Sequence, residues 1–186
     1  MARTLTEEIL SAARAGRPEA LREIYEVLAP SILAYLAGKG CDDPEALAQE
    51  VFLTVFGRLS SLTGGLSGLR TFAFSVAHAR MVDDTRRRDR QPVFTQFHPA
   101  TDLRLSASAE ETVLESGVEI GAMLEGLTPR QKEVLLLRVV ADLSIEESAK
   151  IMGSSEGAVK QLQSRALKIL KDRLERGEES AHERIA

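Results

Sequence analysis

Helix start and stop signals divide this chain of 186 residues into two groups of helical segments. Thr6 and Asp43 precede helical stretches, and Gly- and Pro-containing runs interrupt them, as at residues 16–18 and 38–40. Leu, Ala, Glu and Arg are abundant, whereas aromatic residues make up only 4% of the chain and Trp is absent. This composition favours helices, so we predict an all-α protein.

The first group predicts a small helical domain at residues 1–90. We expect helices over residues 6–15, 18–38, 44–59 and 69–88, because apolar residues recur there at helical spacing. The last of these offers four residues for the core: Phe72, Val76, Ala77 and Val82. Residues 60–68 contain three glycines and no apolar stripe, so we expect a loop there.

The second group predicts a helix-turn-helix within a domain at residues 109–176. Thr128 followed by Pro129 indicates the start of a helix that continues through Val140. Ser144, with Glu147 three residues later, is typical of a capping box and begins a short helix ending near residues 152–153. Ser154 or Ser155 then caps a longer helix that runs to about residue 174. A short helix, a Gly-containing turn and a longer helix form the helix-turn-helix pattern.

The formal net charge of −4 lies entirely between the two groups. Residues 1–90 carry 12 basic and 12 acidic side chains, and residues 122–186 carry 11 of each. Residues 91–121 carry 1 basic and 5 acidic side chains. Because residues 91–108 also contain two prolines and several Ser and Thr, we expect a flexible acidic linker there. The remaining residues, 177–186, form a charged tail.

Several classes of protein are disfavoured. The single cysteine, Cys41, excludes a disulfide within the chain, and with His78, His98 and His182 it does not make a usual zinc site. No metal or nucleotide motif is present, so we expect no cofactor. No apolar run approaches 18 residues, and residues 1–8 are acidic where a signal peptide would be apolar. These features predict a cytoplasmic protein.

The last long helix has one basic face on a helical wheel of 100° per residue. Lysine and arginine neutralise phosphates, and glutamine and arginine form hydrogen bonds with base edges, so this face predicts DNA reading. A solvated helix face is the alternative. The basic face has no acidic residue and contains Lys160, Gln161, Ser164, Arg165, Lys168 and Lys171. The apolar face contains Ala158, Val159, Leu162, Ala166, Ile169, Leu170 and Leu174. A second basic cluster at residues 86–90 predicts contact with a nucleic-acid backbone, or simply a helix end that favours cations.

Five segments together resemble a known family. They are residues 43–53 (Asp-Pro-Glu-Ala-Leu-Ala-Gln-Glu-Val-Phe-Leu), 69–80 (Leu-Arg-Thr-Phe-Ala-Phe-Ser-Val-Ala-His-Ala-Arg), 127–138 (Leu-Thr-Pro-Arg-Gln-Lys-Glu-Val-Leu-Leu-Leu-Arg), 144–153 and 155–160. This tandem resembles bacterial sigma-70 family factors of the extracytoplasmic-function (ECF) type, over about residues 5–90 and 109–175. The resemblance implies two helical domains, region 2 and region 4, joined by a flexible linker. It also implies a transcription initiation factor rather than an enzyme. The implied partners are the β and β′ subunits of core RNA polymerase, promoter DNA and an anti-sigma factor that clamps both domains.

The resemblance implies three sets of site residues. The core-polymerase set is Glu45, Leu47, Gln49 and Glu50; the −10 DNA set is Leu62, Phe72, His78, Arg80, Arg86, Arg87 and Arg88; the −35 DNA set is Ser155, Lys160, Gln161, Ser164, Arg165 and Lys168. Ala46 replaces a usual acidic residue, and His78 with Ala79 replaces a usual Arg-Asn pair. Leu162 lies in a stretch that departs from the commoner family pattern, which predicts a different −35 preference.

Linker geometry agrees with two separated DNA sites. The −10 and −35 names imply centres about 25 base pairs apart, or roughly 85 Å at ~3.4 Å per pair. A flexible chain of ~25 residues averages ~28 Å and extends to ~80 Å, so the linker would be stretched when both sites are engaged. Two other functions remain open at this point: a dimeric helix-turn-helix regulator that binds duplex DNA alone, and a helical protein-interaction module.

Overall fold

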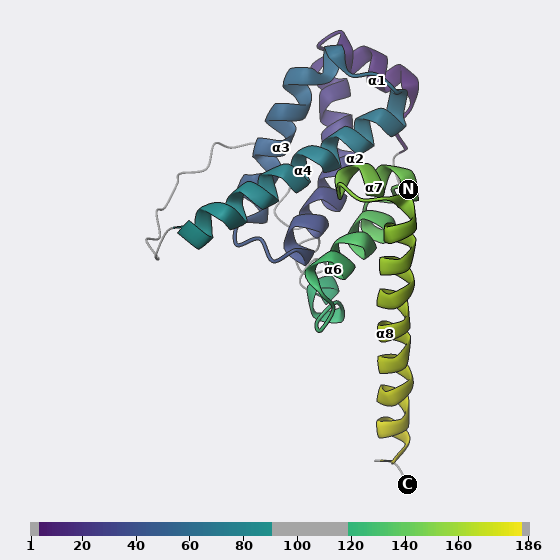
Figure 1. Ribbon diagram of the computed structural model, residues 1–186. Helices are drawn as coiled ribbons and strands as arrows, with labels where there is room; N and C mark the ends of the chain where they lie inside the picture. Colours follow the sequence, from purple (N-terminus) through teal and green to yellow (C-terminus); the bar gives the residue numbers. More distant parts are fainter. Residues whose placement is uncertain (1–3, 91–118, 184–186) are drawn as a thin grey trace.

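All regular secondary structure in the described part of the chain is helical, as predicted (Figure 1). The computed structural model describes residues 4–90 and 119–183, with side chains for residues 4–87 and 119–175. The predicted linker at residues 91–108, and residues 109–118 of the second predicted domain, lie outside the described residues.

Four α-helices form the first group: α1 (Glu7–Arg14), α2 (Pro18–Gly38), α3 (Pro44–Arg58) and α4 (Gly65–Arg90). A 3-10 turn, η1 (Leu59–Ser61), follows α3. Helix α2 packs against the other three helices and has the largest buried face, which includes Ile24, Ile32 and Tyr35. Tyr35 meets Phe74 of α4 edge-on, with 5.6 Å between ring centroids. The core of this group therefore surrounds α2.

Local capping explains where these helices begin. The Thr6 hydroxyl accepts a hydrogen bond of 3.3 Å from the backbone N–H of Ile9, and Asp43 accepts one of 2.9 Å from the N–H of Ala46. These bonds satisfy N–H groups that have no partner within the first helical turn. The predicted starts of α1 and α3 are confirmed.

The predicted loop at residues 60–68 is wrong for more than half of its length. Residues 60 and 61 belong to η1, and α4 begins at Gly65, four residues before the expected start at Leu69. Gly68 lies inside the helix, where a Cβ atom would overlap the backbone carbonyl oxygen of Thr63. This glycine therefore permits a close approach between α4 and the segment before it, rather than loop flexibility.

The buried face of α4 also differs from the expected one. Phe72, Val76 and Val82 are only half-buried, whereas Ala77 is buried as predicted. The helix packs on both α2 and α3, and a different stripe from the expected one faces these two helices. That stripe consists of Leu69, Ala73, Phe74, Ala77 and Met81.

We expect Gly68→Ala to destabilise the protein by about 1–3 kcal/mol, because the new methyl group would force the backbone near Thr63 to move. Gly57→Ala is the matched control, because Gly57 also lies in a helix and has open space around its Cβ position. That control should stabilise the protein by about 0.5–1 kcal/mol through helix propensity. Urea unfolding of the wild type and the two variants measures both effects. Equal changes of the same sign in the free energy of unfolding would contradict the assigned role of Gly68.

The second group contains α6 (Pro129–Leu135), a π-helical turn η2 (Leu136–Val140), α7 (Ile145–Ile151) and α8 (Glu156–Glu183). A short helical segment at residues 119–123 precedes them. Capping boxes begin α6 at Thr128 with Gln131, and α7 at Ser144 with Glu147. The predicted starts are confirmed, and the expected helix through Val140 ends in a π-helical turn.

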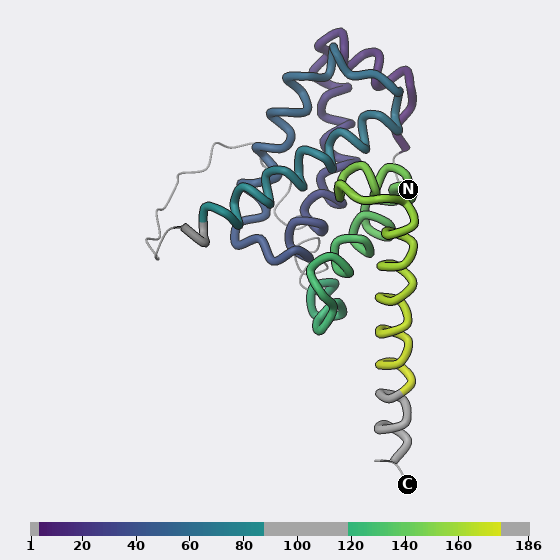
Figure 2. Tube along the Cα trace, viewed as in Figure 1, coloured from purple at the N-terminus to yellow at the C-terminus, as the bar shows by residue number. Residues whose placement is uncertain are grey.

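The two groups pack directly against each other. Helix α7 lies beside α4, and η2 lies beside the C-terminal part of α2 (Figures 1 and 2). Buried apolar residues of both groups form one continuous cluster. Helix α8 packs on α6 and α7 and then extends past the rest of the molecule.

Candidate nucleic-acid interface

The helix-turn-helix is built from α7, a turn at residues 152–155 and α8. Gly153 has φ of +56°, a left-handed conformation that glycine adopts without steric cost. The N–H of Ser154 donates to the carbonyl of Ala149 at 3.0 Å, which closes the end of α7. The Ser155 hydroxyl accepts a hydrogen bond of 3.2 Å from the N–H of Ala158 and caps α8. The predicted helix-turn-helix is therefore present, with Ser155 rather than Ser154 as the cap.

Helix α8 divides into two faces as the wheel predicts. Val159 and Ala166 are buried, and Leu162, Ile169 and Leu170 are half-buried against α6 and α7. All six predicted −35 residues are exposed: Ser155, Lys160, Gln161, Ser164, Arg165 and Lys168. The structure thus places Lys160, Gln161, Ser164, Arg165 and Lys168 on the solvent-facing side of α8, with Ser155 exposed at its N-terminus. Their contact with DNA stays a prediction.

Two details of the wheel are wrong. Ala158 and Leu174, expected on the apolar face, are exposed, and the Leu174 residue is 69% exposed. The basic face is also not free of acid, because Asp172 and Glu175 fall within it at 100° per residue, and Glu175 Oε1 lies 3.6 Å from Lys171 Nζ. Ala158 is in the first turns of α8, and Leu174 is on the part that extends past the other helices.

The basic end of α4 is exposed at Arg86 and Arg87, and Arg87 pairs with Asp84 on the same helix at 3.2 Å. The side chain of Arg88 lies outside the described residues. Arg80 points instead toward α3, where it pairs with Glu50 at 3.4 Å. This contact joins a predicted −10 residue to a predicted polymerase-binding residue.

The other predicted −10 residues are not equally accessible. Leu62 and Phe72 are half-buried and pack against the apolar core. The Leu62 carbonyl accepts a hydrogen bond of 2.9 Å from the Arg14 guanidinium, which fixes the short connection before α4. His78 lies against the second helical group. The structure therefore does not gather Leu62, Phe72, His78 and Arg80 into one open surface.

The predicted polymerase-binding residues on α3 separate by burial. Leu47 is buried in the core of the chain, Gln49 is half-buried, and Glu45 and Glu50 are exposed. Leu53 is 69% exposed and shares a helix face with Glu45 and Gln49, at i,i+4 spacing. The prediction from the sequence missed Leu53, although an apolar residue outside the buried stripe of a helix is a recognisable signal.

A polar cluster that the sequence did not predict surrounds Glu133 of α6. The buried Glu133 carboxylate accepts from His78 Nδ1 at 2.5 Å and from Lys39 Nζ at 3.1 Å. The Tyr35 hydroxyl lies 3.4 Å from His78 Nδ1. Burial alone would raise the pKa of Glu133, but the hydrogen bond from His78 and the charge of Lys39 outweigh it and lower the pKa. Glu133 therefore stays ionised inside the contact between the two groups.

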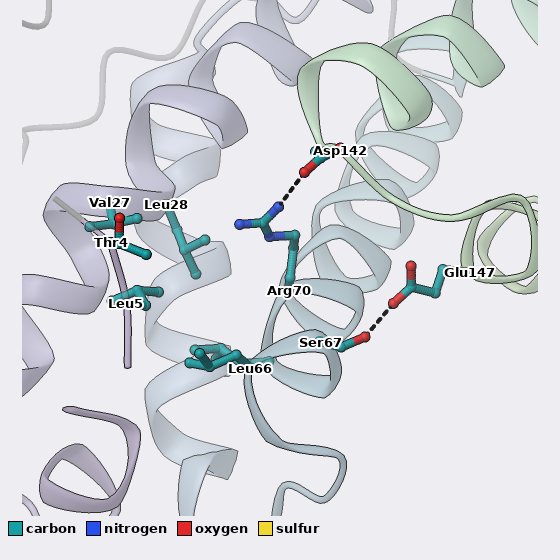
Figure 3. Close-up of a pocket in the computed structure, with 10 residues that line it drawn as sticks. Thr4, Leu5, Val27, Leu28, Leu66, Ser67, Arg70, Asp142 and Glu147 are labelled. Carbon is teal, nitrogen blue, oxygen red and sulfur yellow. Dashed lines mark hydrogen bonds and ion pairs between the residues drawn. The ribbon is translucent and has the colours of Figure 1, made fainter. Parts of the chain in front are cut away.

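A second polar contact surrounds Glu147 of α7, at the edge of a cavity of about 440 Å³ (Figure 3). Its carboxylate accepts hydrogen bonds from Ser67 at 2.6 Å and from Thr71 at 2.7 Å. Arg70 pairs with Asp142 at 3.2 Å across the same cavity. Burial would raise the pKa of Glu147, but the bonds from Ser67, Thr71 and Ser144 prevail and lower it to about 2.

This pKa makes the contribution of Glu147 dependent on pH. Because its folded pKa lies below the ordinary value of 4.5, its stabilisation is present above pH 4.5 and is lost as the pH falls toward about 2. We expect the stability difference between the wild type and Glu147→Gln to be constant from pH 7 to 5 and to shrink below that range. Urea midpoints at stepped pH measure it, with Glu146→Gln as a control for an exposed carboxylate on the same helix. A difference that stays constant down to pH 3 would contradict this assignment.

Within the described ranges, no group of three or more His, Cys, Asp or Glu residues could hold a metal ion. No helix there is long and apolar enough to cross a membrane.

Comparisons with known proteins agree on one family. Residues 117–170 match the family description "Sigma-70, region 4". The chain is 33% identical over 183 residues to the ECF RNA polymerase sigma factor SigD of Mycobacterium tuberculosis, covering 90% of this chain and 83% of that protein. It is 32% identical over 143 residues to the ECF RNA polymerase sigma factor SigX of Bacillus subtilis, covering 74% of this chain and 73% of that protein.

Two solved structures show the same fold. CnrH in complex with the cytosolic domain of CnrY matches with a TM-score of 0.63 at 18% identity, covering 91% of this chain and 96% of that one. The sigma factor RpoE of Bartonella quintana, in complex with the anti-sigma factor NepR, matches with a TM-score of 0.60 at 21% identity. The match covers 83% of this chain and 96% of that one.

Proposed function

This chain belongs to the ECF type of the sigma-70 family, and we propose that it is a transcription initiation factor that directs core RNA polymerase to specific promoters. The polymerase carries out the chemistry, so we assign no catalytic residue to this chain. We place the protein in the cytoplasm, where core polymerase and promoter DNA meet. By analogy with RpoE bound to NepR, we also propose that an anti-sigma factor binds this chain.

The exposed face of α8 carries the proposal, because it combines phosphate-binding and base-reading side chains on one surface. We assign it to the −35 element. Gln161 and Arg165 have the donors and acceptors to read base edges in the major groove, and Lys160 and Lys168 neutralise phosphates. Ser155 presents a hydroxyl at the N-terminus of α8, the end of a helix that favours a phosphate.

The first domain is assigned to the −10 element. The exposed cations Arg86 and Arg87 at the end of α4 support contact with the DNA backbone. Leu62, Phe72 and His78 lie on the same helix or just before it. Opening a duplex costs a few kcal/mol for each unstacked base, so a basic flank that holds the DNA backbone suits strand separation.

The outer face of α3 is assigned to core polymerase. Glu45 and Glu50 offer exposed carboxylates to a basic partner surface, and Leu53 adds an exposed apolar side chain beside them. An apolar anchor with charged neighbours is a common arrangement at protein interfaces. Leu47 supports this face from inside the core rather than by direct contact.

Reconstituted transcription tests the proposal. Purified protein added to core polymerase should initiate at discrete sites in a genomic promoter pool, whereas core polymerase alone should not. Folded protein that directs no initiation from the pool would overturn the proposal. Tight, specific binding of duplex promoter DNA in the absence of polymerase would instead favour a stand-alone helix-turn-helix regulator.

A further inference from the structure

Residues 62–65 connect η1 to α4, and helix α1 holds this connection at both ends. At one end, the Arg14 guanidinium donates to the carbonyl of Leu62 at 2.9 Å. At the other end, the N–H of Leu66 donates to the Glu7 carboxylate at 2.9 Å. Glu7 and Arg14 are the first and last residues of α1, so a single helix spans the connection.

Helix α1 is itself fixed to the core of the first domain. Leu10 and Ala13 are buried, and the helix packs against both α2 and α4. Such packing on an apolar face gives a short helix a stability that it would lack alone in water. The two hydrogen bonds therefore tie the connection to a rigid frame.

Glycines allow the connection to lie this close to α1. Gly64 and Gly65 have φ of +87° and +62°, a conformation that residues with side chains rarely adopt. A Cβ atom on Gly65 would lie 2.5 Å from Glu7 Oε1. The N–H of Gly68 also donates to the carbonyl of Gly64 at 2.9 Å. The backbone of the connection thus has one defined shape, with Thr63 and Gly64 exposed at its outer edge.

The environment of Arg14 indicates a role beyond stability. Its Nε atom is buried and has no hydrogen-bond partner among the described residues. A buried donor without a partner is unfavourable, so a flexible apolar side chain such as methionine would pack there at lower cost. What the arginine adds is its bond to the carbonyl of Leu62, a residue assigned above to the −10 element.

We propose that Glu7 and Arg14 are positioning residues for −10 recognition, which act on residues 62–65 without touching DNA. A fixed backbone loses less conformational entropy on binding and adapts less to a wrong base. The connection and the exposed cations Arg86 and Arg87 lie at opposite ends of α4, about 30 Å apart. A strand held by these cations reaches the connection within about nine nucleotides. The proposal rests on the function proposed above.

Discrimination between −10 sequences provides the main test, with the full-length protein assembled on core polymerase. The probes are single-stranded oligonucleotides that carry the −10 element of a promoter found in the genomic pool, with each base substituted in turn. Arg14→Met and Glu7→Ala should each lower the preference for the cognate base by about fivefold at one or two positions, the equivalent of one hydrogen bond. Binding of a scrambled oligonucleotide should not change. Urea unfolding should show that Arg14→Met is about as stable as the wild type.

Matched variants separate positioning from a merely structural role. Glu7→Gln keeps an acceptor for the Leu66 N–H and should keep wild-type discrimination. Glu8→Ala removes an exposed carboxylate from the same turn of α1 and controls for charge. Gly65→Ala should act like Glu7→Ala. Its control is Gly40→Ala, because Gly40 has φ of +79° and open space around its Cβ position.

Amide hydrogen exchange tests the two bonds in the free protein, independently of polymerase. The Leu66 N–H should exchange about tenfold faster in Glu7→Ala than in the wild type, and Glu8→Ala should leave its rate unchanged. Both bonds hold one short connection, so their effects should not add. The double variant Glu7→Ala with Arg14→Met should lose little more discrimination than the more affected single variant.

The proposal is overturned if the wild type initiates from the promoter and both Glu7→Ala and Arg14→Met keep its base discrimination. It is also overturned if Glu8→Ala and Gly40→Ala lower discrimination equally, or if Leu66 exchange is the same in Glu7→Ala and the wild type. A wild-type protein that directs no initiation from any promoter would instead overturn the proposed function, and the role of Glu7 and Arg14 in promoter recognition with it.

Discussion

Replacing Lys160 and Arg165 together by alanine is expected to lower promoter-specific initiation by about 100-fold, without loss of stability. Both side chains are exposed on α8, and the adjacent residues Val159 and Ala166 carry its packing. A good base-edge contact contributes about 1–3 kcal/mol of discrimination, and losing a phosphate contact weakens binding further. Run-off transcription from a cognate promoter with core polymerase measures the effect, and urea unfolding confirms that the fold is retained.

The control removes two cations from a surface assigned no DNA contact. Arg17 and Arg22 are both exposed at the start of α2, so Arg17→Ala with Arg22→Ala should keep near wild-type initiation. A promoter with a scrambled −35 element provides the second arm. The wild type should initiate much less on this promoter than on the cognate one. The variant Lys160→Ala with Arg165→Ala should initiate almost equally on the two promoters. An unaltered transcript level from the double variant on the cognate promoter would contradict the role of α8 and favour a protein-interaction module.

Local signals made most helix boundaries predictable from the sequence. Each helix cap accepts a hydrogen bond from an N–H group three residues later, so its effect depends only on residues nearby in the sequence. The caps are Thr6, Asp43, Thr128 and Ser144. The predicted loop at residues 60–68 is wrong because glycine occurs both in loops and where a helix makes a close backbone contact. Glycines in a segment without an apolar stripe predict a loop, whereas Gly68 lies in α4 and permits close approach to the backbone carbonyl of Thr63. That contact exists only in three dimensions.

The exposed face of α8 was predictable because a helical wheel requires only the period of 3.6 residues. The contacts of Glu133 and Glu147 were not. Lys39 and Glu133 are 94 residues apart, and Ser67 and Glu147 are 80 apart. No periodicity or spacing relates such pairs, since they depend on how two domains dock. The sequence suggested region 2 and region 4 as separate units, and the structure adds the interface between them.

Leu53→Ala is expected to weaken binding to core polymerase by about thirtyfold while leaving stability nearly unchanged. Leu53 is 69% exposed, so its truncation should alter the free energy of unfolding by less than ~0.5 kcal/mol. If the residue is buried on binding, the lost apolar surface corresponds to about 2 kcal/mol, or roughly thirtyfold in affinity. Equilibrium titration of labelled core polymerase measures the affinity, and urea unfolding of the same preparation measures the stability.

Two variants make this result specific to the α3 face. Leu174→Ala truncates a leucine of equal exposure, 69%, on α8, and should bind core polymerase like the wild type. Leu47→Ala should show the opposite pattern to Leu53→Ala. Because Leu47 is buried, its truncation should destabilise the fold by about 2–5 kcal/mol. Under conditions that keep this variant folded, its affinity for core polymerase should equal that of the wild type. Wild-type affinity for Leu53→Ala would mean that polymerase does not cover this face of α3, and the assignment of Glu45 and Glu50 would fail with it.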